Sequence, residues 1–252
     1  MKIKQICMFV LALFGLVPML QAQSFDKLWR QVDQAEKKSL PQTVIKLTGD
    51  IFDKGVKERN SAQMFKAYMW RMSSRESIDP DSLYADITGL ELWAKETDKP
   101  MDKAILHSIL AGIYSDYASN NRWQLRQRTI IVDETPSADM REWTANMFVD
   151  KVKANIKTAL ADSVLLLETS ARTYVPFVKL GDASEYYHHD MYHLLASRSI
   201  EQLKQIDGMA ENTLTGQVST ERQEVFTIYK NMISSFEKLG FRDGTLLTTL
   251  DF

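Results

Sequence analysis

Apolar residues recur at intervals of three and four through most of the chain beyond residue 24, the spacing that places them on one face of an α-helix. Several of these patterns follow residues that favour helix starts, such as Ser24, Pro41, Asn60 and the pair Asp79-Pro80. The spacing of Asn60 and Gln63 also fits a capping box. The pattern therefore predicts a succession of helices that begin near residues 25, 41, 61, 80, 100, 138, 187 and 219.

Each predicted helix has one apolar face that we expect to be buried. In the second helix this face comprises Val44, Ile45, Leu47, Ile51, Phe52 and Val56, and in the helix from residue 219 it comprises Val225, Phe226, Tyr229, Ile233 and Phe236. Gly208 and Gly240 are expected to end the last two of these helices. The pattern from 138 to 168 is continuous and predicts a single long helix.

One stretch interrupts the helical pattern. Residues 172–180 place Pro176 among β-branched and aromatic residues, and Gly181 follows. Because no second strand candidate is present, we expect an extended segment packed on helices and no sheet of three or more strands.

The predicted helix starts are regularly spaced. Helices begin near Ser24, Asn60 and Asp98, which corresponds to a helix-pair repeat of about 37 residues. We therefore expect an all-α fold of paired antiparallel helices, either solenoid-like or an irregular right-handed α-α array. The alternative is a helical bundle in which this spacing is a coincidence.

The first 22 residues have the composition of a secretory signal. Lys2 and Lys4 precede the apolar run 6–20, and Leu20-Gln21-Ala22 fits a signal-peptidase site. We expect residues 1–22 to be removed, so that a helical domain 23–252 is exported to the periplasm or the cell surface. Cys7, the only cysteine, would leave with the signal. No later segment is apolar enough to predict a membrane span.

The net charge of −2 is close to balance, and acidic and basic residues are interspersed, so we expect no nucleic-acid partner. The one local exception is the basic stretch 122–128, in which Arg122, Arg126 and Arg128 flank Trp123 and Leu125. A basic cluster with an aromatic residue can bind phosphates. The favoured interpretation is a surface turn whose Trp123 and Leu125 dock inward while the arginines pair with nearby acids.

The only sequence that indicates a mechanism is His189-Asp190-x-x-His193, which resembles the zinc-binding His-Glu-x-x-His of metalloproteases. His188 lies beside it, and Glu185 or His107 would be needed as a third ligand. The favoured interpretation is a polar helix start, with an acidic side chain at the positive end of the helix dipole and histidines bonded to loop backbone.

No other catalytic pattern is present. A mature chain without cysteine has no thiol, and the sequence contains neither a glycine-rich phosphate loop nor a Gly-x-Ser-x-Gly elbow. We therefore expect no enzyme activity, no catalytic, metal or cofactor-binding residues and no cofactor. On this interpretation His189→Ala and His193→Ala change stability only modestly. His107 is expected to be a satisfied core or boundary histidine.

Several short stretches resemble the N-terminal helical region of large exported alpha-2-macroglobulin-like proteins of Bacteroidetes. They are Phe25-Asp-Lys-Leu-Trp-Arg-Gln-Val, Leu40-Pro-Gln-Thr-Val-Ile-Lys-Leu, Ile113-Tyr-Ser-Asp-Tyr, Asn121-Arg-Trp, Asp182-Ala-Ser-Glu-Tyr-Tyr and His189-Asp-Met-Tyr-His-Leu-Leu. The resemblance implies membership in a protease-trapping system. The bait segment and the Cys-x-Glu-Gln thioester of that family have no counterpart here, so no functional residue is carried over.

The sequence thus favours a non-catalytic helical scaffold or interaction region of an alpha-2-macroglobulin-like, protease-inhibitor-type protein. Its expected partners are protein, namely downstream domains of a larger chain, or proteases indirectly. Four apolar residues near the end, Leu246, Leu247, Leu250 and Phe252, are expected to fold back as a cover or stay exposed where a further domain docks. The alternatives are a small exported metal-dependent hydrolase that uses His189 and His193, and a periplasmic solenoid that binds peptides or proteins.

Overall fold

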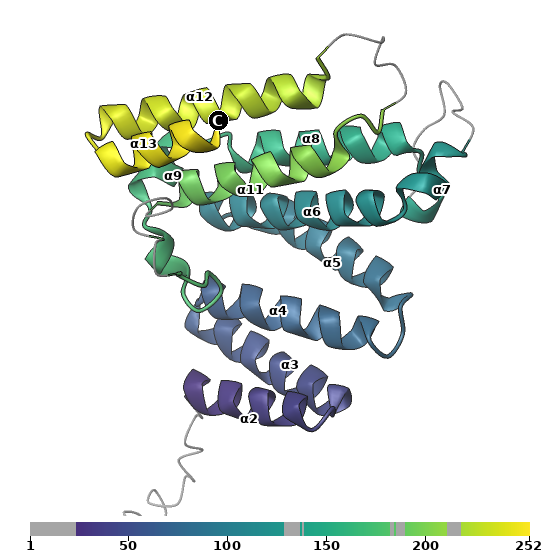
Figure 1. The fold of residues 1–252 in the computed structure, drawn as a ribbon. Coiled ribbons are helices and arrows are strands. Elements are labelled where there is room, and N and C mark those ends of the chain that lie inside the picture. The colour runs from purple at the N-terminus through teal and green to yellow at the C-terminus, as the bar shows by residue number, and fades with distance from the viewer. Residues whose placement is uncertain (1–23, 129–136, 138, 182–183, 185–189, 211–217) are drawn as a thin grey trace, which may run out of the picture.

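The computed structural model describes residues 24–128, 137, 139–181, 184, 190–210 and 218–252, and this part of the chain is all-helical (Figure 1). Its α-helices are α2 (Phe25–Lys37), α3 (Pro41–Glu58), α4 (Ser61–Glu76), α5 (Ser82–Glu96), α6 (Pro100–Asn120), α7 (Arg122–Arg126), α8 (Ala145–Ala159), α9 (Ser163–Glu168), α11 (Met191–Ile206), α12 (Thr220–Lys238) and α13 (Arg242–Asp251). Two 3₁₀ turns, Met140–Glu142 and Ala171–Tyr174, complete the list. The all-α prediction is confirmed. The predicted signal, residues 1–22, lies outside the described residues.

The helices stack in a column in roughly the order of the chain. Figure 1 shows α2 and α3 at one end, α4 and α5 in the middle, and α12 with α13 at the other end. α6 lies at the centre, where it packs against α5, α8 and α11. Segments that are distant in sequence therefore line the same central region.

The predicted caps are largely confirmed. The side chains of Ser24, Asn60 and Ser219 each accept a hydrogen bond from a backbone N–H in the first turn of the helix that follows. Gly208 and Gly240 follow α11 and α12 with φ values of 66° and 69°, a left-handed backbone that glycine adopts without strain. These signals are local in sequence, so they do not depend on how the helices pack.

One predicted helix start and one predicted capping box need adjustment. α5 begins at Ser82, two residues after Pro80, because the Asp79 side chain bonds to the backbone N–H of Asp81 and forms a turn first. At α4, the capping box is only half made. The Gln63 side chain does not reach back to the cap, because it accepts a hydrogen bond from Trp29 Nε1 at 2.6 Å, which ties α4 to α2.

The apolar interior has two parts. A small N-terminal cluster joins α2, α3 and α4 and comprises Leu28, Trp29, Val32, Ala35, Val44, Ile51 and Ala67. A larger main core runs from α4 to α12, with fully buried residues such as Phe65, Leu106 and Phe148. Phe52 is partly buried and packs against both, so the two parts meet along α3 and α4.

The predicted buried faces are wrong at two residues. Val56 and Phe226 are 50% and 44% exposed. In α3 the buried position is Gly55, where an added Cβ would lie 2.8 Å from Met64 Cγ. α4 approaches α3 so closely at that glycine that the contact face is rotated away from Val56.

The single long helix predicted over 138–168 is also wrong, because the described part of this stretch contains a 3₁₀ turn and two α-helices. α8 ends at Ala159, and the side chain of Asp162 caps α9 by accepting a hydrogen bond from the N–H of Leu165. The break lets α9 turn back to pack against α11.

The non-helical stretch near Pro176 packs on helices, as predicted, but the prediction that it is an extended segment is wrong. It consists of the 3₁₀ turn Ala171–Tyr174 and further turns up to Val178. The described residues contain no strand, and only an isolated bridge joins Ser170 to Asp190. Figure 1 shows this segment running from the level of α9 down to α4.

The last described helix, α13, and its C-cap Phe252 leave three large apolar side chains exposed, although the Phe252 ring also contacts Phe226 and Tyr229 of α12. Leu246, Leu250 and Phe252 are 60%, 73% and 49% exposed. The buried side of α13 is formed instead by Gly244 and Thr248. None of the described helices combines the length and the apolar character that crossing a bilayer requires.

Candidate functional site

The predicted His-Asp-x-x-His stretch holds helices together. Asp190 is the N-cap of α11, and its carboxylate accepts a hydrogen bond from the backbone N–H of His193 at 2.9 Å. The same carboxylate lies 2.7 Å from His193 Nδ1. Both side chains are buried, with exposures of 1% and 0%. His188, His189 and Glu185 lie outside the described residues, whereas Asp190 at the helix start agrees with the favoured interpretation.

The other edge of the His193 ring faces α12. Nε2 lies 2.9 Å from Ser235 Oγ and 3.3 Å from the Met232 carbonyl, and the ring stacks on Phe236 with 3.4 Å between centroids. The order acid, imidazole, hydroxyl is that of serine hydrolases. Here, however, Ser235 Oγ also donates to the carbonyl of Met232 at 2.7 Å, as serines inside helices often do. His193 thus bonds to side chains of two helices, and not to loop backbone as the sequence led us to expect.

Because protein atoms engage both ring nitrogens of His193, a metal ion would have to displace the partner of one of them. Among the described residues, no group of three or more His, Cys, Asp or Glu side chains is placed to hold a metal ion. His107 is half-buried on α6 and bonds to Asn155, far along the chain from this cluster.

The prediction for the basic stretch 122–128 is right for Leu125 and wrong for Trp123. Leu125 is buried at 2% exposure, but Trp123 is 72% exposed and does not dock inward. The arginines bond mainly to backbone carbonyls: Arg122 donates to those of Gln205 and Asp207 at the C-terminal end of α11, and Arg128 to that of Trp143. Helix C-termini leave such carbonyls unpaired, which makes them partners that sequence alone does not reveal.

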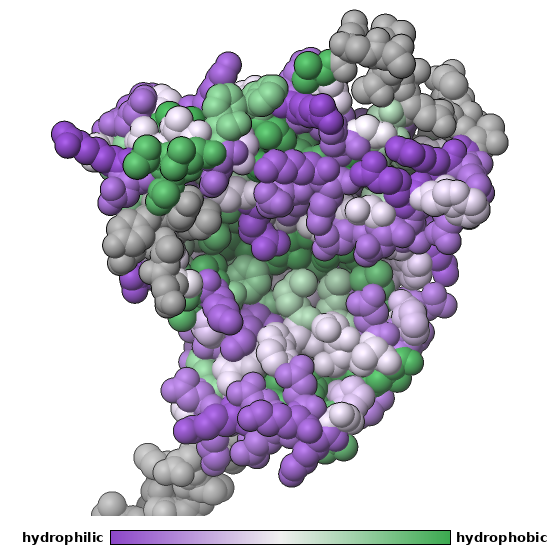
Figure 2. Space-filling model, viewed as in Figure 1, coloured by the Kyte–Doolittle hydropathy of each residue, from purple (hydrophilic) through white to green (hydrophobic). Residues whose placement is uncertain are grey.

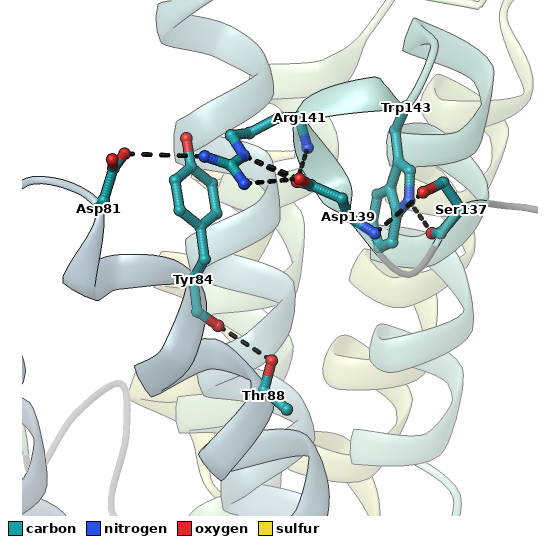
Figure 3. A network of polar contacts seen from close by, with 7 residues as sticks. All are labelled: Asp81, Tyr84, Thr88, Ser137, Asp139, Arg141 and Trp143. Atoms are coloured by element: carbon teal, nitrogen blue, oxygen red, sulfur yellow. Dashed lines mark hydrogen bonds and ion pairs between the residues drawn. The ribbon is translucent and has the colours of Figure 1, made fainter.

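A polar network joins the first 3₁₀ turn to α5 (Figure 3). The Arg141 guanidinium bonds to both oxygens of Asp139, at 2.9 Å and 2.7 Å, and lies 4.5 Å from the ring centre of Tyr84. Asp81 is a more distant ion-pair partner at 3.9 Å. The bonds from Arg141 lower the pKa of Asp139, and burial raises the pKa of Tyr84 to about 12. Since the acids already engage the arginine, this network closes a turn and leaves little charge for a ligand.

An extensive concave surface lies between α4, α6, α11 and the segment 175–180, and we call it the central groove. One of its two cavities, about 470 Å³, is lined by Ile105 and Ile109 of α6, by Leu194 and Leu195 of α11 and by other side chains. The second, about 640 Å³, lies between α4 and the segment 175–180. Figure 2 shows the hollow as a hydrophobic area in the middle of this face, with hydrophilic side chains around it.

The two cavities adjoin each other. Met69, Phe177, Val178 and Lys179 line both of them. Phe177 is held in place by packing on Phe65 of the main core, with ring centres 5.4 Å apart. The segment 175–180 therefore forms a partition along the groove, with apolar pockets on both sides.

The charged residues of the groove are mostly basic. Among the residues that the structure describes, Lys66, Lys179 and Arg198 line it, together with one acid, Asp116. None of these three cations makes an ion pair within 4 Å with any residue that the structure describes. Burial lowers the pKa of Lys66, and the distant charge of Asp33 opposes this effect. A groove with a positive excess, in a chain whose net charge is −2, favours ligands with negative charge.

Unused hydrogen-bonding groups also border the groove. The backbone N–H groups of Phe177, Lys179 and Leu180 have no acceptor within the described chain. Ser108, which also lines the groove, is 2% exposed, and its hydroxyl has no hydrogen-bond partner among the described residues either. Groups of this kind are normally paired or hydrated, so the groove offers donors to whatever occupies it.

The sequence predicted that the segment around Pro176 packs on helices and left a peptide-binding solenoid as an alternative, but it did not predict where a groove lies or which residues line it. The sequence signal that could have indicated the groove is the segment 175–180 itself, because a non-helical stretch beside helices leaves backbone N–H and C=O groups unpaired. Comparisons of the chain with protein families, with curated proteins and with solved structures found no match.

Proposed function

We propose that this chain is a non-catalytic interaction module that binds an extended, acidic and apolar polypeptide segment in the central groove. The observation that carries the proposal is the segment 175–180, where unpaired backbone N–H groups lie between two apolar cavities. A polypeptide supplies both complements at once, because its carbonyls accept from such N–H groups while its alternate side chains enter pockets.

The charges of the groove define the ligand further. Lys66, Lys179 and Arg198 favour acidic side chains beside the apolar ones, and Asp116 is the one acid of the described lining that opposes them. A ligand without a peptide backbone would leave the N–H groups of the segment unpaired. This makes a polypeptide a better match than a lipid chain of similar apolar area.

The wider context is part of the same proposal. We infer that the stacked helices form a solenoid-like array of antiparallel pairs, in which the groove is the inner surface. The signal-like residues 1–22 support export to the periplasm or cell surface. The resemblance to alpha-2-macroglobulin-like proteins supports a protein partner, such as another domain of a protease-trapping assembly.

The test uses blocked eight-residue peptides that alternate leucine with glutamate, and a matched set that alternates leucine with lysine. We expect the acidic set to bind at least about tenfold more tightly, a difference of about 1.4 kcal/mol. Replacing single amides by esters in the peptide weakens its carbonyl acceptors and should raise the Kd. Isothermal titration calorimetry measures both effects. Equal binding of the two peptide sets, or none of either, would contradict the proposal.

Matched variants locate the binding surface. Met69→Glu places a negative charge where the cavities meet and should abolish binding of the acidic peptides. Leu92→Glu makes the same kind of change at an exposed residue of α5 outside the groove and should leave binding unchanged. Lys179→Glu and Lys230→Glu form a second pair, with Lys230 exposed on α12 as the control. If both members of either pair lose binding equally, the groove is not the site.

A further inference from the structure

A third cavity, separate from the two of the central groove, lies between α5, α6 and α8. Its volume is about 390 Å³. Its floor is apolar, but four of the side chains that line it are basic: Lys95 of α5, Lys103 and His107 of α6, and Lys151 of α8. Three helices thus place cationic groups around one small hollow.

The one acid of this cavity is already engaged. Glu91 bonds to Lys151 Nζ at 2.7 Å and to the hydroxyl of Tyr114 at 2.9 Å. Lys95 and Lys103 make no ion pair within 4 Å with any described residue. The cavity therefore has two uncompensated positive charges, although the chain as a whole is at −2.

The hydrogen bonds around His107 fix the orientation of its proton. The amide nitrogen of Asn155 donates to the carbonyl of Lys151 at 2.8 Å, so its oxygen is the atom 2.7 Å from His107 Nδ1. An amide oxygen only accepts, so Nδ1 carries the hydrogen. Asn155 is 5% exposed, which holds this arrangement rigidly.

His107 Nε2 is the nitrogen that remains. It makes no hydrogen bond with any residue that the structure describes. With Nδ1 already donating, protonation adds a second donor at Nε2 and a positive charge. This ring is oriented by a buried amide on the neighbouring helix, in the way that ligand-binding histidines are commonly oriented by their partners.

We propose that this cavity binds a small phosphate-type oxyanion, held by Lys95, Lys103 and Lys151 and by a protonated His107 that donates from Nε2. A doubly charged phosphate group with several acceptor oxygens matches several cationic donors, whereas a carboxylate offers one charge and two oxygens. The apolar floor suits the carbon skeleton of a phosphorylated small molecule. This site rests on residues other than those of the central groove, so neither proposal depends on the other.

The test uses inorganic phosphate as the probe, at constant ionic strength, with the full-length chain. Calorimetry should show saturable binding, and addition of phosphate at pH 7 should move the Nε2 nitrogen resonance of His107 towards the protonated position. His107→Gln identifies that resonance among the histidines. Acetate at the same ionic strength should bind at least about tenfold more weakly.

The paired variants Lys95→Gln with Lys103→Gln should raise the Kd for phosphate about tenfold or more. Both side chains are exposed, so the fold should be retained. The control Lys37→Gln with Lys46→Gln removes the same charge from exposed positions of α2 and α3 and should leave the Kd unchanged. Non-saturable binding by the wild type, equal loss in the control, or acetate that binds as tightly as phosphate would each overturn the proposal.

Discussion

Removing the His193 imidazole tests whether the Asp190–His193 pair is a structural joint between α11 and α12. The ring is fully buried, bonds to Asp190 on one side and Ser235 on the other, and stacks on Phe236. The sequence led us to expect a modest effect of His193→Ala. The structure changes that expectation, because a buried side chain with both nitrogens engaged is lost.

The magnitude follows from the contacts. A hydrogen bond to a charged group contributes about 1.5–3 kcal/mol to stability, and an aromatic pair adds about 0.5–1.5 kcal/mol beyond its buried area. We therefore expect His193→Ala to lower the free energy of unfolding by about 3 kcal/mol, or the Tm by about 6–12 °C for a domain of this size. Asp190→Asn keeps a good helix cap while removing the charge, so its cost should be smaller, about 1–2 kcal/mol.

Equilibrium urea unfolding followed by circular dichroism measures these differences, with unchanged m-values as the check on two-state behaviour. His107→Ala is the matched control. That ring is half-buried and bonds to one neutral amide, that of Asn155, so its loss should cost only about 1 kcal/mol.

If His193→Ala lowers the free energy of unfolding by no more than His107→Ala does, His193 is not a structural joint between α11 and α12. A second, more informative contradiction would be stoichiometric zinc in the purified wild type that is lost in the His193 variant. Elemental analysis of both proteins after dialysis decides this point. Such a result would establish the metal-binding alternative for His189 and His193.

Three further predictions concern packing, pH and association. Gly244→Ala should destabilise the chain by about 1–3 kcal/mol, because the new Cβ would lie 2.7 Å from two phenylalanine rings. Gly49→Ala has nothing within 4 Å of the new Cβ and should stabilise α3 by about 0.5–1 kcal/mol. Thermal unfolding of the two variants measures both changes. Because the folded pKa of Asp139 is lowered, its contribution is present above the unfolded value of 3.8 and is lost as the pH falls through the lower folded value. Asp139→Asn should therefore flatten the stability profile in that acidic window, as pH-dependent urea titrations would show. Replacing the exposed Leu246 and Leu250 with serine should reduce concentration-dependent oligomers in sedimentation velocity without loss of helix.

The helices were predictable largely because residues next to each helix end determine where it begins or ends. Ser24, Asn60 and Ser219 cap helices through hydrogen bonds to the residues that follow them within the same turn. Asp162 carried the same signal, which the continuous apolar pattern of 138–168 hid. A cap residue inside a long apolar pattern is thus evidence for a break.

The orientation of each helix was less predictable, because it depends on partners elsewhere in the chain. Gly55 rather than Val56 faces α4, since only a residue without a Cβ permits that approach. Trp123 stays in solvent because its neighbours anchor to carbonyls at the end of α11. The central groove and the His107 cavity are likewise tertiary: each combines residues from helices whose proximity no local pattern encodes.

The meeting of the two apolar clusters at α4 has a mechanical consequence. Trp70 lines the central groove while its ring packs edge-on against Trp29, with 5.8 Å between centroids. A pulling force that separated α2 from α4 would break the contact between Trp29 and Trp70 before the main core was disturbed. Force applied from the N-terminal side would then lower the affinity of the groove for the proposed polypeptide ligand. A bound ligand would in turn oppose the separation of α2 from α4.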